Sequence, residues 1–159
     1  CLILSKSLME LKEQYALMEE AIEHLGVKPE DARCEDEGQW LVYRGDLELY
    51  IDVWEEPASE WTYHPGAHDT VTFQVVCPIS KMPSDDKLLF FYEDLLQMNF
   101  YTHFVSFVIN KKEGMLTCAF KRVMSNITKS DIIEAIDATG YYSSLAWKML
   151  NQPYELEKV

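Results

Sequence analysis

Two histidines and an aspartate in one loop have the residue types and spacing best suited to chemistry. His64 and His68 flank a Pro-Gly pair, and Asp69 follows directly. A turn at Pro-Gly could bring both imidazoles and the carboxylate onto one cation, a donor set that zinc and similar metals bind. However, the two histidines stand outside any known ligand spacing, and Pro-Gly is an ordinary turn signal. We therefore expect a surface loop without a metal, and the alternative is a metal-binding protein or metal-dependent enzyme centred on this loop.

Other residues that could be reactive are better explained by structure. Cys77 and Cys118 fall in predicted strands and are expected to be buried, inert thiols. Arg44-Gly45-Asp46 lies between two predicted strands and is typical of a hairpin turn. The sequence contains no nucleophile elbow and no glycine-rich phosphate loop. We therefore predict no catalytic residues, no cofactor and a non-enzymatic protein.

The composition limits the partners and the compartment. The chain has 159 residues, 48% hydrophobic and 26% charged, which fits one globular domain over 1–159. Its 14 Lys+Arg against 27 Asp+Glu give a net charge of −13, so nucleic acid and anionic membranes are poor partners. Four scattered cysteines without a CxxC pair favour a cytoplasmic protein. A start at Cys1 rather than Met is typical of a trimmed or partial chain.

The hydrophobic spacing predicts three helices. The first covers about 8–25, with a capping box at Ser7 and Glu10 and a stop at Gly26. The second covers 85–98 after an N-cap at Ser84, and Asn99 is the expected stop. The third runs from about 128–130 to 150 and is expected to end at Asn151 and Pro153.

Alternation of apolar and polar residues predicts five strands. They cover 40–43, 47–54, 70–77, 103–110 and 115–123, and the last two form a hairpin. In the second and third strands one face is apolar and the other largely polar, which indicates an antiparallel sheet covered on one side. The predicted fold is therefore α+β, a single antiparallel sheet of about five strands with three helices in the order α-βββ-α-ββ-α.

This layout resembles the YbjN family of bacterial sensory transduction regulators, which shares its fold with type III secretion chaperones. The similar parts are the aromatic-rich helix ending in Asn99-Phe100, the hairpin from Phe104–Asn110 to Leu116–Phe120, and the closing helix. The resemblance implies a one-layer antiparallel sheet with helices packed on it, commonly dimeric and without catalysis.

Three apolar surfaces are candidates for protein binding. On helix 85–98 the apolar residues cover an arc of about 180° at 100° per residue, wider than one core-facing stripe needs. One side would face the sheet, and the other would face a partner. The candidates on this helix are Phe91, Leu95 and Met98, those on the outer sheet face are Tyr50 and Trp54, and those on the last helix are Tyr141, Leu145 and Met149.

Together these patterns predict a cytoplasmic bacterial regulator or chaperone-like adaptor that acts as a homodimer. An unidentified protein or peptide is the expected client, and the acidic surface favours a basic one. The aromatic pair on the sheet is explained equally well by cross-strand pairing that only stabilises the sheet.

Overall fold

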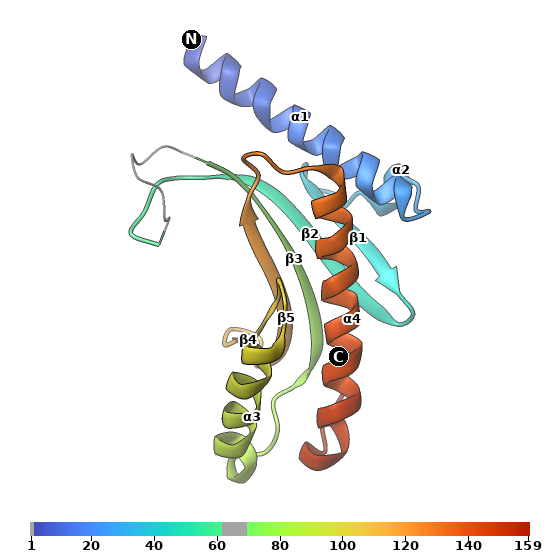
Figure 1. Cartoon of the computed structure of the whole chain (residues 1–159), viewed down its shortest axis with the longest axis vertical. Helices are drawn as coiled ribbons and strands as arrows, with labels where there is room; N and C mark the ends of the chain where they lie inside the picture. Colours follow the sequence, from blue (N-terminus) through green and yellow to red (C-terminus); the bar gives the residue numbers. More distant parts are fainter. Residues whose placement is uncertain (1, 62–69) are drawn as a thin grey trace. The chain divides into compact units, whose positions relative to one another are not determined.

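The computed structural model describes residues 2–61 and 70–159, with side chains from residue 10 onward (Figure 1). Five strands form one antiparallel sheet in the order β1-β2-β3-β5-β4. The predicted α+β class, five-stranded sheet and order of the main elements are confirmed. The elements are α1 (Leu2–His24), α2 (Pro29–Ala32), β1 (Gln39–Arg44), β2 (Leu47–Glu56), β3 (Thr70–Lys81), the 3-10 helix η1 (Asp85–Lys87), α3 (Leu88–Tyr101), β4 (Ser106–Asn110), β5 (Met115–Val123) and α4 (Lys129–Tyr154).

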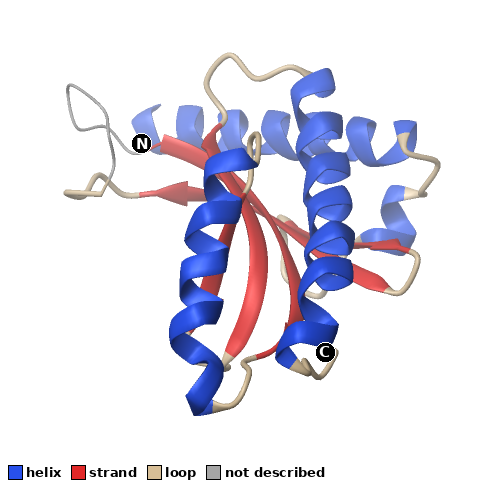
Figure 2. Ribbon diagram, turned by 60° about the horizontal axis from the view of Figure 1, so that its bottom comes forward, coloured by secondary structure: helices blue, strands red, loops and turns tan. Residues whose placement is uncertain are grey.

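The described residues divide into two compact units. Unit 1 contains those up to Leu41, from Ile51 to Gln74 and from Lys121 to Ile133, and unit 2 contains the remainder. In unit 2, α3 and α4 lie on the same side of the strands (Figure 2). The buried side chains of unit 1 include Met18, Ile22, Trp40, Ile51, Val53 and Phe73, and those of unit 2 include Leu49, Val75, Ile79, Phe91, Leu116 and Leu150.

One glycine has a demonstrable steric role in the core of unit 1. Gly38 has a φ of +83°, and a Cβ there would lie 2.6 Å from the carbonyl oxygen of Val53 and 2.8 Å from the Tyr15 ring. Its carbonyl accepts a hydrogen bond from the Val53 N–H at 2.8 Å. Glycine is therefore required both for the left-handed backbone and for the close approach of α1 to β2.

The start of α1 differs from the prediction. The helix begins at Leu2, so Ser7 and Glu10 lie inside it rather than at its start. Residues 2–6 contain neither glycine nor proline, so nothing in them interrupts helical backbone. The predicted stop is confirmed, because Gly26 follows the helix with a φ of +84°.

The predicted end of the second helix was also wrong. The helix α3 continues through Asn99 to Tyr101, and the next strand begins at Ser106 rather than 103. Phe104 has a φ of +69°, a conformation outside the extended range of a strand. The side chain of Asn99 bonds to β4, so this residue contributes a tertiary contact and does not end the helix.

The last helix begins as predicted but ends later. Thr128 and Asp131 exchange hydrogen bonds in a capping arrangement, with the Thr128 N–H donating to the Asp131 carboxylate at 2.8 Å. Neither Asn151 nor Pro153 stops α4, which ends at Tyr154. The Asn151 amide instead donates to the Trp147 carbonyl one turn back, at 2.7 Å. Tyr154 is buried, so its packing extends the helix past the proline.

The third strand is longer than predicted, because β3 continues past residue 77 through Pro78 to Lys81. The short helix α2 was not predicted, and the first turn of the predicted helix 85–98 is the 3-10 helix η1 rather than α-helix. None of the described helices is both long and apolar enough to span a membrane.

Candidate protein-interaction surface

Helix α3 has two apolar sides, as its composition indicates, but only one of them is buried. Phe91 and Leu95 are buried, at 0% and 4% exposure, and Leu88 and Met98 are partly buried. Phe91 packs edge-on against Tyr154 of α4, with 5.0 Å between ring centroids. This stripe therefore holds α3 against the rest of unit 2.

The other apolar side of α3 is exposed. Leu89, Tyr92, Leu96 and Phe100, which we call the α3 strip, follow each other at intervals of three, four and four residues. At 100° per residue they fall within about 80° of one another. Leu96 is 72% exposed and Phe100 is 82% exposed. Such a strip is typical of a helix that packs against a second apolar surface.

The predicted composition of this surface needs correction. Phe91 and Leu95 contribute to the core of unit 2, and Met98 is partly buried, so these three residues are not the exposed side. The width of the apolar arc indicated two surfaces, but it did not indicate which side faces the sheet. The long-range contact of Phe91 with Tyr154 decides that, and no local pattern contains it.

The edge strand β4 is closed by side chains at the end of α3. The Asn99 amide donates to the Phe107 carbonyl at 3.1 Å, and its oxygen accepts from the Phe107 N–H at 2.6 Å. The Thr102 hydroxyl donates to the Val105 carbonyl at 2.9 Å. These backbone groups point away from β5, the direction from which another strand would pair. The end of α3 therefore occupies this part of the edge.

The two aromatic residues proposed on the outer sheet face belong to different units, and each has contacts inside its own. Tyr50 is 37% exposed, and its hydroxyl lies 2.5 Å from the Glu48 carboxylate. Trp54 is partly buried under the Lys121 ammonium group, which is 5.2 Å from the ring centroid. Lys121 also pairs with Glu56 at 2.9 Å, so an incoming ligand would have to compete for Trp54.

The third candidate surface lies on α4. Tyr141 is 54% exposed and Met149 is 53% exposed, whereas Leu145 between them is partly buried. The opposite side of this helix is buried, and small or polar residues occupy its middle part. Thr139 and Ser143 donate their hydroxyls to carbonyls one turn back, both at 2.7 Å.

The buried cysteines face the small side of α4. Cys77 and Cys118 are fully buried beside Ser143, and the Cys77 thiol donates to the Pro78 carbonyl at 3.7 Å. Burial is the main cause that raises the pKa of Cys77 and raises the pKa of Cys118 to about 12. These thiols remain protonated at neutral pH, which agrees with the predicted structural role.

The predicted Arg44-Gly45-Asp46 turn is confirmed between β1 and β2, with a φ of +62° at Gly45. Arg44 pairs with Asp137 at 2.7 Å, and Asp46 pairs with Lys158. Both charged residues of the tripeptide therefore have structural partners in unit 2.

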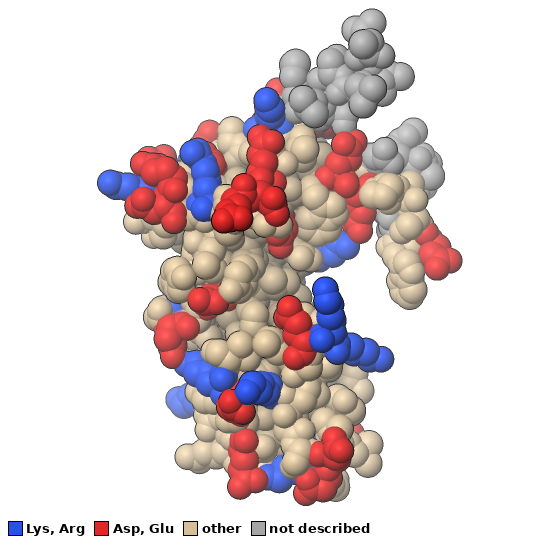
Figure 3. Space-filling model, turned by 180° about the vertical axis from the view of Figure 1, so that it is seen from behind, with Lys and Arg blue, Asp and Glu red and all other residues tan. Residues whose placement is uncertain are grey.

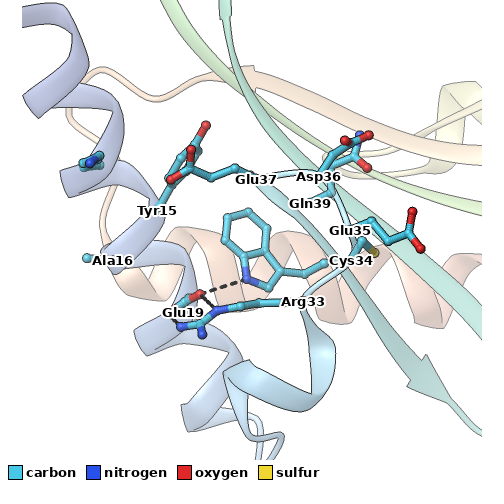
Figure 4. A pocket seen from close by; sticks show the side chains of 12 residues that line it. Tyr15, Ala16, Glu19, Arg33, Cys34, Glu35, Asp36, Glu37 and Gln39 are labelled. Atoms are coloured by element: carbon cyan, nitrogen blue, oxygen red, sulfur yellow. Dashed lines mark hydrogen bonds and ion pairs between the residues drawn. The ribbon is translucent and has the colours of Figure 1, made fainter.

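Unit 1 contains a pocket of about 520 Å³ between α1 and residues 33–40 (Figure 4). Glu19 lies on its wall and accepts two hydrogen bonds from Arg33, at 2.6 and 2.7 Å, and one from the Trp40 indole at 3.2 Å. The hydrogen bond from Arg33 is the main cause that lowers the pKa of Glu19. This carboxylate is thus an ionised anchor that joins α1 to β1.

Acidic side chains gather around the α1–α2 end of unit 1 (Figure 3). The pocket rim carries three of them, Glu35, Asp36 and Glu37. A surface of this sign repels polyanions and speeds the approach of basic partners.

The residues of the predicted metal loop, His64, His68 and Asp69, lie outside the described residues. Within 2–61 and 70–159, no group of three or more His, Cys, Asp or Glu side chains could hold a metal ion. The metal alternative therefore stays a prediction.

Solved structures of protein complexes share this fold. A chain of the ExsC–ExsE complex matches with a TM-score of 0.61 at 9% identity, over 88% of this chain and 95% of that one. The HopA1–SchA chaperone–effector complex gives a TM-score of 0.61 at 8% identity, over 88% and 97%. A chain of the heterodimeric ExoU–SpcU complex from the type III secretion system of Pseudomonas aeruginosa matches with a TM-score of 0.58 at 14% identity. The match covers 85% of this chain and 98% of that one.

These likenesses confirm the predicted type III secretion chaperone-like fold. No family model and no curated protein matches the chain. Membership of the YbjN family therefore stays a prediction that rests on the resemblance of the sequence.

Proposed function

We propose that this protein is a non-enzymatic, cytoplasmic, chaperone-like adaptor that binds a segment of another protein and acts as a homodimer. The observation that carries the proposal is the α3 strip, an exposed apolar row on a helix whose opposite side is already buried in the core. Similarity in fold to chains from chaperone–effector and secretion complexes supports the same class of function. A regulatory role, as in the YbjN family, would be one use of such binding.

The dimer is tested by solution mass. Two copies should pair through their α3 strips, because an exposed row of one tyrosine, one phenylalanine and two leucines suits helix-to-helix packing. We expect light scattering at micromolar concentration to give about twice the 18.5 kDa mass of the chain. Leu96→Asp should give the monomer mass with an unchanged circular dichroism spectrum.

Tyr43→Asp is the matched control for Leu96→Asp. Tyr43 is 61% exposed on β1, so the substitution introduces the same charge at an exposed residue away from the α3 strip. It should leave the dimer intact. A monomeric unmodified protein, or a Leu96→Asp variant that remains dimeric, would count against this arrangement.

The client-binding surface is proposed to be the exposed strip of Tyr141, Leu145 and Met149 on α4. Apolar residues at this spacing can hold the alternate side chains of a bound segment, and the acidic surface favours basic clients. Two designed peptides, alternating Leu-Lys and alternating Leu-Glu, test both parts by fluorescence anisotropy. The Leu-Lys peptide should bind more tightly, and Tyr141→Asp with Met149→Asp should abolish binding. Equal binding of both peptides would contradict the preference for basic clients.

A further inference from the structure

The segment that follows α4 folds back onto the end of strand β3. We call residues 155–159 the strap. In Figure 1 the C-terminal mark lies beside α4 above its lower end, so the chain reverses direction there. Glu155 makes the reversal with a φ of +50°, in the left-handed region that few residues other than glycine adopt. Tyr154, the residue before it, is buried against Phe91 and its hydroxyl donates to Asp94. The strap thus begins directly after a buried tyrosine, at a sharp reversal of the chain.

The strap pairs with β3 as a short strand. The Lys81 N–H donates to the Glu157 carbonyl at 2.9 Å, and Ser80 forms an antiparallel bridge with Lys158. The next amide, that of Met82, donates to the Gly114 carbonyl at 3.1 Å. Successive amides of a strand point to opposite sides. The strap therefore occupies one side of the end of β3, and the loop before β5 occupies the other.

Backbone bonds and ion pairs both hold the strap: the Leu156 N–H donates to the Asn151 carbonyl at 3.0 Å, and the charged groups pair with neighbours. Lys158 pairs with Asp46 and lies 5.4 Å from the centroid of the Trp147 ring, and Glu157 pairs with Lys81 at 2.7 Å. The carboxylates of Asp46 and Glu157 are 75% and 70% exposed. Exposed ion pairs contribute little to stability and weaken as salt increases. The ion pairs of the strap are thus far more exposed than the buried tyrosine that precedes it.

The closed arrangement also leaves one buried polar group unsatisfied. Ser80 is 0% exposed, and its hydroxyl oxygen has no hydrogen-bond partner. Buried hydroxyls normally have one, because leaving them unpaired costs stability. A different occupant of this position could supply the missing bond.

We propose that the strap closes an interaction site at the end of β3, and that an extended segment of a partner protein takes its place. The site selects a carboxylate followed by a lysine or arginine, because Lys81 receives the anion and Asp46 with the Trp147 ring receives the cation. Backbone pairing with Lys81 requires an extended partner. This proposal rests on the proposed protein-binding function, because the extended segment would come from a protein that the chain binds.

Hydrogen exchange of two neighbouring amides tests whether the strap opens. Lys158→Glu places a like charge beside Asp46 and removes the cation from Trp147. We expect exchange of the Lys81 amide to rise about tenfold or more, while that of Met82, bonded on the opposite side, stays the same. In the unmodified protein, raising NaCl from about 0.05 M to about 0.5 M should accelerate hydrogen exchange of the Lys81 amide but not that of the Met82 amide.

Lys148→Glu is the control, since it makes the same charge change on the exposed surface of α4. It should leave the hydrogen-exchange rates of both amides unchanged. If Lys158→Glu does not accelerate hydrogen exchange of the Lys81 amide, the strap is not held by these charges and the proposal fails. If hydrogen exchange of the Lys81 and Met82 amides accelerates together, the whole end of the strand opens, and this result also overturns the proposal.

A synthetic peptide with the sequence of residues 153–159 tests whether the site accepts an external strand. Added to the Lys158→Glu protein, it should restore protection of the Lys81 amide in a saturable manner. A peptide with Glu157 and Lys158 exchanged should not, because both charges would meet groups of their own sign. No protection, or equal protection by both peptides, would refute the site. Solution mass and binding of the Leu-Lys peptide are measured separately, so failure here is distinguishable from failure of the proposed function.

Discussion

Helices α3 and α4 pack on the same side of unit 2 but differ in how they are buried. The buried stripe of α3 carries large residues, Phe91 and Leu95, and its other side is also apolar and exposed. The buried stripe of α4 carries small or polar residues in its middle, such as Thr139 and Ser143, whose hydroxyls bond within the helix, and larger ones such as Leu150 and Tyr154 toward its end. Small buried residues allow the middle of α4 to approach its neighbours closely. Both helices keep an exposed apolar strip, and Leu96 and Phe100 are the most exposed part of the α3 strip.

The largest expected effect separates the two sides of α3. Phe91→Ala removes a fully buried ring from the core and should lower the free energy of unfolding by about 3–5 kcal/mol. Phe100→Ala, the matched change at an 82% exposed position, should alter it by no more than about 0.5 kcal/mol in the monomer. Urea unfolding at low protein concentration measures both. Equal losses would show that α3 does not have one buried and one exposed apolar side.

A smaller effect is expected where α3 closes the sheet edge. Asn99→Ala removes both hydrogen bonds to the backbone of Phe107 and should cost about 1–2 kcal/mol. Gln97→Ala on the exposed surface of the same helix is the control and should be nearly neutral. Because the freed edge can pair with another chain, the Asn99 variant should also aggregate faster on heating. A stable, soluble Asn99→Ala protein would mean that this edge needs no protection.

The sequence predicted local features well and long-range ones poorly. β5 was predicted with its observed bounds, because apolar alternation and the glycine-containing loop before it are local signals. Asn99 was predicted as a helix stop from its local preference, although its amide pairs with a strand eight residues later. Pro153 was expected to end α4, but buried Tyr154 holds the last turn in place.

The same distinction applies to the candidate site. The wide apolar arc predicted two surfaces on α3, yet which residues are exposed depends on the contact between Phe91 and Tyr154. The bridge between Ser80 and Lys158 connects residues far apart in the sequence. A strand of so few residues gives no alternation pattern, so the strap could not be predicted.

Alkaline pH tests the contact that joins α3 to α4. Burial, and then the hydrogen bond to Asp94, raise the pKa of Tyr154 to about 12 from 10.0. A tyrosine with a raised pKa stabilises the fold below pH 10, and this contribution is lost as pH rises toward 12. The free energy of unfolding should therefore fall over this range. Tyr154→Phe should cost about 1 kcal/mol at neutral pH and make that fall shallower.

Tyr141→Phe is the control for the alkaline experiment, because Tyr141 is exposed on α4. It should leave the free energy of unfolding at neutral pH unchanged. Burial of Cys118 raises the pKa of its thiol from 9.0 to about 12, so part of the fall remains in every variant. A Tyr154→Phe protein with the full alkaline fall would show that the tyrosine hydroxyl does not couple the two helices.

The smallest effect concerns the bend where α4 gives way to the strap. Glu155 has a φ of +50°, and a residue with a Cβ pays a steric cost in that region which glycine avoids. Two effects of Glu155→Gly oppose this gain: glycine loses more entropy on folding, and the exposed ion pair with Lys87 is removed. The losses therefore cancel part of the stabilisation from the relieved backbone. We expect a net gain of about 0.5 kcal/mol in the free energy of unfolding, measured in urea. Glu155→Ala removes the same ion pair but keeps the Cβ, so it should be less stable than the original. If alanine and glycine behave alike, the backbone at this bend carries no strain that would favour release of the strap.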